Sequence, residues 1–302
     1  MPLWREYGID PGLFEDYRDG QFVLGHFGVE EGRLIAEFPA KWRKKIARMA
    51  GDYREVERKR TIRMLDKLKT ALVPRVCDFD GTISWLDQAY ECDKVRSFHA
   101  LISNRPDERP KTIDLESVID NADLWLAQDK DEVTRNAKEL LAACRFLIRQ
   151  CNRLEIIDRE FVPSGGTGNK WLNPISAIAS ELARHNPSVS RFELHSYDPP
   201  IRGWPKGKFV GDCKRHLPSL IPKGISVGVS LWRQRAGGRQ FHERVIATDI
   251  GGVLLDPGID EGKQGEVYVL RRVRDSQEFL DRFVAGAGVY DLVDSAVVNG
   301  AA

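Results

Sequence analysis

The chain has 302 residues, of which 42% are apolar and 30% charged, and this is enough apolar material for the cores of two ordinary domains. Its 46 lysines and arginines nearly balance 45 aspartates and glutamates, so the overall charge neither demands nor excludes a nucleic-acid partner. No segment approaches ~18 consecutive apolar residues, and the N-terminus, MPLWREYGID, lacks the regions of a signal peptide. We therefore expect a cytoplasmic protein without a membrane span.

The number and spacing of the cysteines bear on disulfides and metal sites. They are five in number, contain no CxxC pair, and stand at Cys77, Cys92, Cys144, Cys151 and Cys213. An odd number without metal-site spacing favours reduced, mostly buried thiols over a disulfide framework. We expect no metal ion and no cofactor.

Residues 1–130 differ in sequence pattern from residues 131–302, although no Pro-, Gly- or Ser-rich linker separates them. Residues 41–70 carry apolar residues at helical spacing in a basic background, which predicts one or two amphipathic helices. Such a surface is typical of a solvated helix face; a nucleic-acid contact surface is the alternative. We expect a mostly helical α+β domain that serves recognition or docks a protein partner.

The second domain alternates strands and helices. Asp131–Gln150 has an acidic start and strong helix formers, so it predicts a helix, and LEIID at Leu154–Asp158 predicts a short buried strand. Further helices are predicted near 174–184, 212–221 and 277–284, and further strands at 191–197, 225–232, 241–249, 252–255 and 266–270. This order predicts one mixed α/β sheet flanked by helices.

One motif in this domain contains residue types that are suited to phosphate chemistry. In FHERVIATDIGG, residues His242, Arg244 and Asp249 stand at the spacing H-x-R-x4-D. On a strand, positions 242 and 244 point to the same face, which brings an imidazole and a guanidinium together. A neutral histidine nitrogen attacks phosphorus while a fixed cation stabilises the phosphate oxygens. Asp249 is the candidate for orienting the imidazole.

This motif and the element order around it resemble the phospholipase D superfamily, whose signature is H-x-K-x4-D, and in particular its single-motif nucleases. The resemblance covers about half of the chain and implies a metal-independent phosphodiesterase. The family mechanism uses two histidines, one as nucleophile and one as acid, so a single-motif enzyme would act as a homodimer with two His242 side chains face to face. Single-motif members include bacterial restriction and defence effectors, which makes a phage-defence nuclease acting on DNA or RNA the first hypothesis.

Two departures from the family pattern support a second hypothesis. Arg244 replaces the family's lysine, and Gly251-Gly252-Val253 replaces the usual Gly followed by Ser or Asn. The downstream DPGIDEG resembles the G-x-G-L-D element of a phospholipase-D-like domain that follows MIT domains, where the motif reads HDR and the domain is thought to bind phosphoinositide head groups. The second hypothesis is therefore a non-catalytic phosphate-binding or scaffold module.

Other residues are candidates either for the same site or for purely structural roles. Gly251 and Gly252 follow the motif, Asp158 ends a predicted strand, and His195 lies on the next one, so all four are candidate substrate-binding residues. The alternative for His195 is a structural role. The alternative for His242 is a core histidine, with Arg244 paired to an acid such as Asp249 or Glu243.

Two further patterns resemble phosphate motifs. Asp78-Phe79-Asp80-Gly81-Thr82 matches the D-x-D-G-T opening of haloacid-dehalogenase phosphatases, but the strand before it is short and contains a proline, so a turn whose acids bond neighbouring backbone is favoured. Residues 163–170, PSGGTGNK, lack the glycine spacing and the Ser or Thr of a phosphate loop. A flexible loop near the site is the preferred interpretation.

Overall fold

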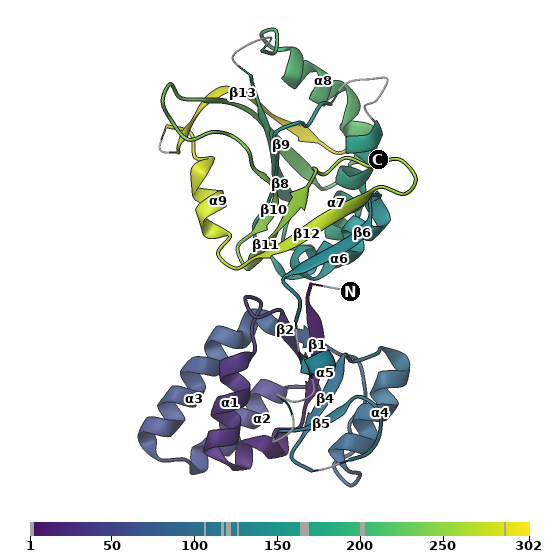
Figure 1. The fold of residues 1–302 in the computed structure, drawn as a ribbon, viewed down its shortest axis with the longest axis vertical. Helices are drawn as coiled ribbons and strands as arrows, with labels where there is room; N and C mark the ends of the chain where they lie inside the picture. Colours follow the sequence, from purple (N-terminus) through teal and green to yellow (C-terminus); the bar gives the residue numbers. More distant parts are fainter. Residues whose placement is uncertain are drawn as a thin grey trace. The chain divides into compact units, whose positions relative to one another are not determined.

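The computed structural model describes residues 3–105, 107–115, 118, 122–125, 127–163, 169–199, 203–286 and 288–302 (Figure 1). The chain divides into an N-terminal unit, Trp4–Gln128, and a C-terminal unit formed by Asp129–Ala302 together with Leu3. The boundary expected after residue 130 lies beside this division. Among the described residues, no helix combines the length and apolarity needed to cross a membrane.

The N-terminal unit is built on a parallel sheet of five strands in the order β3-β2-β1-β4-β5. Its helices α1, α2 and α3 lie on one side of the sheet, and α4 lies on the other (Figure 1). The strands are β1 (Arg5–Ile9), β2 (Arg33–Glu37), β3 (Leu72–Pro74), β4 (Ala100–Ser103) and β5 (Thr112–Asp114). The helices are α1 (Tyr17–His26), α2 (Trp42–Met49), α3 (Glu55–Lys67), α4 (Trp85–Val95) and α5 (Ala122–Trp125), with 3-10 turns η1 (Pro11–Glu15), η2 (Ala50–Asp52) and η3 (Leu68–Ala71).

This α/β architecture differs from the mostly helical α+β domain that the sequence predicts. The helices expected within residues 41–70 are present as α2 and α3. The strands were missed because they are only three to five residues long, and β1 and β4 are almost wholly buried. Strands covered on both faces lack the alternation of apolar and polar residues that marks a half-exposed strand.

A disulfide joins Cys77 to Cys92, with an S–S distance of 2.01 Å, so the expectation of reduced thiols is wrong for these two. The bond ties the segment after β3 to α4, beside the buried rings of Phe38 and Trp85. Cys144, Cys151 and Cys213 are free and buried. Sequence spacing alone does not decide which cysteines meet, because pairing needs suitable Cα separation in the fold.

The C-terminal unit contains an eight-stranded mixed sheet in the order β13-β9-β8-β7-β10-β11-β12-β6. β7, β8 and β9 run parallel, and the remaining neighbours pair antiparallel. The strands are β6 (Lys130–Thr134), β7 (Leu154–Asp158), β8 (Arg191–Tyr197), β9 (Ser226–Gln234), β10 (Arg244–Thr248), β11 (Gly251–Asp256), β12 (Val267–Val273) and β13 (Tyr290–Asn299). The coarse prediction of a mixed α/β sheet flanked by helices is confirmed.

Helices cover both faces of this sheet. The helices are α6 (Ala137–Gln150), α7 (Asn169–His185), α8 (Lys208–His216) and α9 (Gln277–Arg282), with the 3-10 turn η4 (Pro218–Leu220). Leu280 of α9 and the following Phe283 pack against Ile157, Val245 and Ala247. Because side chains alternate along a strand, Arg244 and Asp158 face the opposite layer, which holds α6 and α7.

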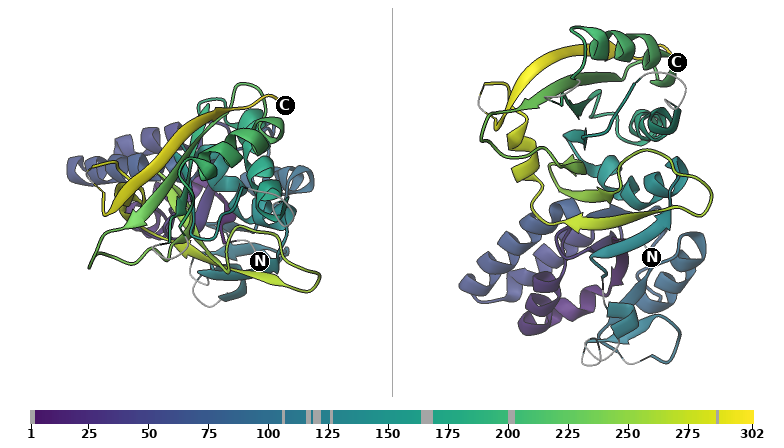
Figure 2. Two further views of the ribbon diagram at one scale, coloured as in Figure 1. Left: turned by 90° about the horizontal axis from the view of Figure 1, so that it is seen from above. Right: turned by 45° about the horizontal axis from the view of Figure 1, so that its top comes forward.

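Several predictions for this unit need correction. The helix expected from Asp131 begins at Ala137, because β6 occupies residues 130–134 and Asn136 caps the helix through Glu139 N. The strand expected over Phe241–Asp249 covers only Arg244–Thr248. β13 was not predicted; it lies at the outer edge of the sheet beside β9, and Figure 2 draws it in yellow.

Candidate functional site

The central pair of the candidate site is Asp158 and Arg244. β7 and β10 are antiparallel neighbours, and their register sets Arg244 opposite Asp158. The Asp158 side chain is fully buried, where it accepts hydrogen bonds from Glu160 N and Ile259 N, each at 2.8 Å. Burial raises the pKa of the Asp158 carboxyl to about 6, against the opposing effects of the two backbone donors and of Arg244.

A loop after β11 closes around this pair. A Cβ atom on Gly258 would lie 3.0 Å from Asp158 Oδ2, 3.2 Å from Asp260 Oδ1 and 3.5 Å from Arg244 Cδ. Only glycine fits that space without moving its neighbours, so the backbone of the loop approaches both acids and the arginine. The sequence element DPGIDEG therefore belongs to the candidate site.

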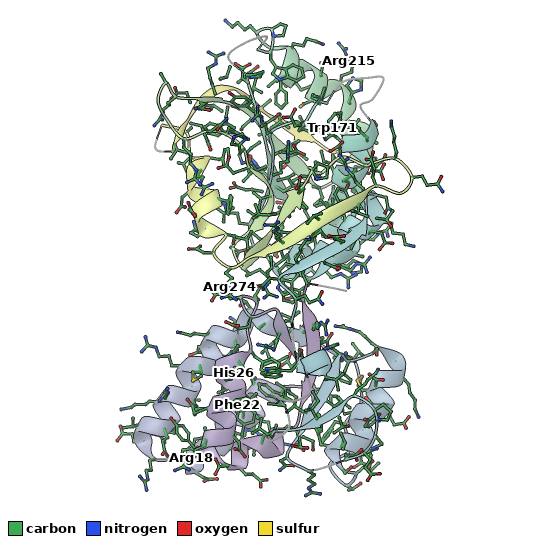
Figure 3. All side chains as sticks on the ribbon, viewed as in Figure 1. Arg18, Phe22, His26, Trp171, Arg215 and Arg274 are labelled. Atoms are coloured by element: carbon green, nitrogen blue, oxygen red, sulfur yellow. A yellow bond between two sulfur atoms is a disulfide. The ribbon has the colours of Figure 1, made fainter. Side chains whose placement is uncertain are left out.

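Asp260 links this loop to two cations. Its carboxylate lies 3.0 Å from Lys170 Nζ and 2.5 Å from an Arg135 guanidinium nitrogen. Lys170 stands in the first turn of α7, and its ammonium lies 4.0 Å from the ring centroid of Trp171, which Figure 3 labels. The α7 N-terminus, with its partial positive charge, thus lies beside the site.

The Arg244 guanidinium is held but not neutralised. Its side chain is 30% exposed, and the nearest carboxylate oxygen across an ion pair, on Glu160, is 3.9 Å from one terminal nitrogen. Its Nε is buried and has no hydrogen-bond partner in the described part of the chain. Most buried donors in folded proteins are paired, so this Nε–H is an exception. The exposed part of the guanidinium is the part that a ligand can reach.

His242 precedes β10 and is exposed, which excludes the core-histidine interpretation. Its Nδ1 lies 3.0 Å from a guanidinium nitrogen of Arg159. Because arginine only donates, Nδ1 accepts this hydrogen bond and the proton of the neutral ring sits on Nε2. In this arrangement Nε2 is a donor toward solvent or a ligand and is not free to attack phosphorus.

Asp249 lies at the opposite end of β10 and has a structural role. Its carboxylate accepts hydrogen bonds from Asn152 N, Asn152 Nδ2 and Arg153 N. The expectation that Asp249 orients His242 is therefore wrong. The alternative that Asp249 or Glu243 neutralises Arg244 is also wrong, because Glu243 pairs with Arg282 and Tyr290 instead.

Gly251 and Gly252 are also remote from Arg244. They begin β11 directly after the turn that contains Asp249, where Gly251 pairs with Thr248. A Cβ on Gly252 would lie 3.0 Å from Ile246 O and 3.5 Å from Ser276 Cβ, so this glycine permits close packing. Neither glycine is near the proposed ligand position.

His195 lies on β8 on the other face of the sheet. Its Nδ1 accepts from Trp232 Nε1 at 2.9 Å, its Nε2 lies 3.2 Å from the Glu155 carboxylate, and its ring stacks on Phe283. These contacts support the structural interpretation of His195 and separate it from Arg244.

Sequence reasoning missed three members of the site. Arg159 directly follows Asp158 but gave no pattern of its own, and Arg135 lies within the segment predicted as helix. Lys170 was noted only in a rejected phosphate loop, of which residues 164–168 lie outside the described residues. Within the described ranges, no group of three or more His, Cys, Asp or Glu side chains is arranged to hold a metal ion.

Comparison with known proteins identifies no family. A scan against models of protein families found no match, and a search of curated proteins found none either.

Replacing Asp249 by alanine removes three hydrogen bonds that hold the turn before β7. We expect Asp249→Ala to lower the free energy of unfolding by about 1–2 kcal/mol, measured by urea denaturation. Asp281→Ala is the matched control, because within the described chain this exposed carboxylate bonds only a Gln277 side chain on its own helix, and its effect should stay within about 0.5 kcal/mol. Unchanged stability in the Asp249 variant would contradict the structural role.

Asp158 should make stability depend on pH. Its native pKa of about 6 lies above the ordinary value of 3.8. Its contribution to the free energy of unfolding is therefore complete below about pH 3.8 and is lost as the pH rises through about 6. An amide cannot ionise, so Asp158→Asn should not show this loss. From about pH 4 to about pH 7, the free energy of unfolding of the variant should rise by about 1–3 kcal/mol relative to that of wild type. Parallel pH profiles from urea denaturation would show that burial does not raise this pKa.

Proposed function

We propose that the C-terminal unit binds the phosphate group of a phosphodiester through Arg244. The observation that carries this proposal is a guanidinium that is 30% exposed and whose ion-pair partner among the described residues, Glu160, lies 3.9 Å away. Arginine also offers a planar fork that matches two phosphate oxygens.

Neighbouring groups favour an anion at the same position. Lys170 brings a second positive charge, and the first turn of α7 adds its backbone dipole. Arg159 brings a third cation next to His242. Asp260 holds the Lys170 ammonium at 3.0 Å, and Glu160 lies 3.2 Å from Arg159.

The family resemblance agrees with this reading of the site. The element order β7, α7, β8, α8, β9, β10 and the motif containing Arg244 resemble the phospholipase D superfamily. The loop with Gly258 and Asp260 resembles the element of the sub-branch thought to bind phosphoinositide head groups. We therefore favour the non-catalytic hypothesis, a phospholipase-D-like phosphate-binding module.

Binding of a fluorescent single-stranded oligonucleotide and of phosphoinositide-containing vesicles tests this proposal and separates the two sources of the phosphodiester. Arg244→Ala should weaken the observed binding at least tenfold, about 1.4 kcal/mol, because it removes the anchoring cation. Arg215→Ala is the matched control: this side chain is 74% exposed on α8, a helix that contacts β9 and β13, and Figure 3 labels it. Equal weakening by both variants, or no binding of either probe, would contradict the proposal.

Hydrolysis is a second candidate function, favoured by one observation. His242 is exposed and stands two positions before Arg244, where the same residue of a second copy of the chain would complete a pair of histidines. The ring would first have to exchange its hydrogen bond with Arg159, since the present tautomer protonates Nε2. A homodimeric, metal-independent nuclease is the form this candidate takes.

Cleavage of plasmid, single-stranded DNA and RNA in EDTA tests hydrolysis. If the protein is such a nuclease, wild type should cleave as a dimer by solution mass, and His242→Ala should lose at least about 100-fold in rate because it lacks the nucleophile. Binding without cleavage by a monomer would support the binding module and remove the nuclease candidate.

A further inference from the structure

The N-terminal unit contains a second position where ligands are expected. The chain builds β1, β2 and β3 outward in one direction and then returns to place β4 on the other side of β1. In open parallel sheets, the crevice outside the carboxyl ends of the strands at such a change of direction is the usual binding position. Here the loops that begin at Asp10 and Asn104 flank that crevice.

A cavity of about 620 Å³ opens between these loops. Asp10, Pro11 and Gly12 line it from the end of β1, and Ser103, Asn104 and Arg105 line it from the end of β4. Its size falls within the range of about 300–1,000 Å³ that is typical of small-molecule sites. Topology and cavity therefore identify the same place independently.

The cavity wall contains two exposed cations, Lys45 and Arg105, whose charges act on the Asp10 carboxylate of the same cavity. Among the described residues, Lys45 of α2 and Arg105 form no ion pair, and both are exposed. Arg109, by contrast, is neutralised by Asp107 at 2.7 Å and by Asp87 at 2.8 Å. Lys45 and Arg105 are therefore the groups available to an anionic ligand.

The floor of the cavity offers groups suited to hydroxyls. Asp10 uses Oδ1 to accept from Gly12 N at 2.8 Å, and its Oδ2 has no hydrogen bond within the described chain. Burial raises the pKa of Asp10, a property common among residues of binding sites. The Asn104 side chain, with both donor and acceptor atoms, lines the same cavity.

The D-x-D-G-T segment forms part of the wall of this cavity. Asp80 accepts from Thr82 N and Oγ1, so the expected turn with acids bonded to neighbouring backbone is confirmed for this residue. Phe79 and Gly81 line the cavity, and the Lys45 ammonium lies 5.4 Å from the centroid of the Phe79 ring. The segment thus encloses a site whose polar groups come from the ends of β1 and β4.

We propose that this cavity binds a phosphorylated polyol of mononucleotide size, with the phosphate on Lys45 and Arg105 and the hydroxyl groups on Asp10 and Asn104. A sugar phosphate and a nucleotide share this chemistry. The site is separate from the Arg244 site and belongs to the other unit of the chain.

Isothermal titration of the full chain with ribose 5-phosphate, AMP and inorganic phosphate tests the proposal. Both organic phosphates should bind with a Kd below about 1 mM. Equal affinity would identify the sugar phosphate as sufficient, and tighter binding of AMP would identify a nucleotide. Lys45→Ala combined with Arg105→Ala should weaken binding at least tenfold, and Asp10→Asn should weaken ribose 5-phosphate more than inorganic phosphate.

Two controls make the result specific. Lys44→Ala removes an exposed lysine next to Lys45 that does not line the cavity, and binding should stay within twofold of wild type. Arg244→Ala should leave it unchanged, which separates this proposal from the one for the C-terminal unit. Absence of binding by folded wild type, or equal losses in the Lys44 and the double variant, would overturn the proposal.

Discussion

The antiparallel pairing of β7 with β10 is the constraint on which the candidate site depends. It sets Arg244 opposite the buried Asp158, and Gly258 lets the loop after β11 approach both residues. The two side chains form no close ion pair among the described residues, and the Arg244 guanidinium stays 30% exposed. A partly exposed planar guanidinium suits the binding of phosphate oxygens.

The buried elements of the C-terminal unit could be predicted from the sequence. LEIID has the pattern of a short buried strand, RFELHSY alternates in the manner of a strand, and the structure forms β7 and β8 over these ranges. Arg244 and Asp158 were also recognised, although not their pairing. The role of Asp249 was misjudged from spacing: five residues along a strand span about 16 Å, so Asp249 and Arg244 cannot share one ligand.

Other features depend on tertiary contacts that a single sequence does not reveal. β6, KDEVT, looks like the charged start of a helix, and only its pairing with β12 makes it a strand. The contact of His242 with Arg159 joins residues 83 positions apart, and it changes the chemistry expected of the histidine. The parallel sheet of the N-terminal unit, and with it the cavity at the ends of β1 and β4, was equally hidden because its strands are short and buried.

Arg244 is proposed to bind phosphate through the exposed part of its guanidinium. Arginine Nε–H resonances in ¹⁵N NMR spectra, with Arg244 assigned through Arg244→Lys, measure this directly during titration with diethyl phosphate. Phosphate binding by Arg244 should shift its Nε–H resonance in a saturable manner. A resonance that does not move while other arginines respond would contradict the claim.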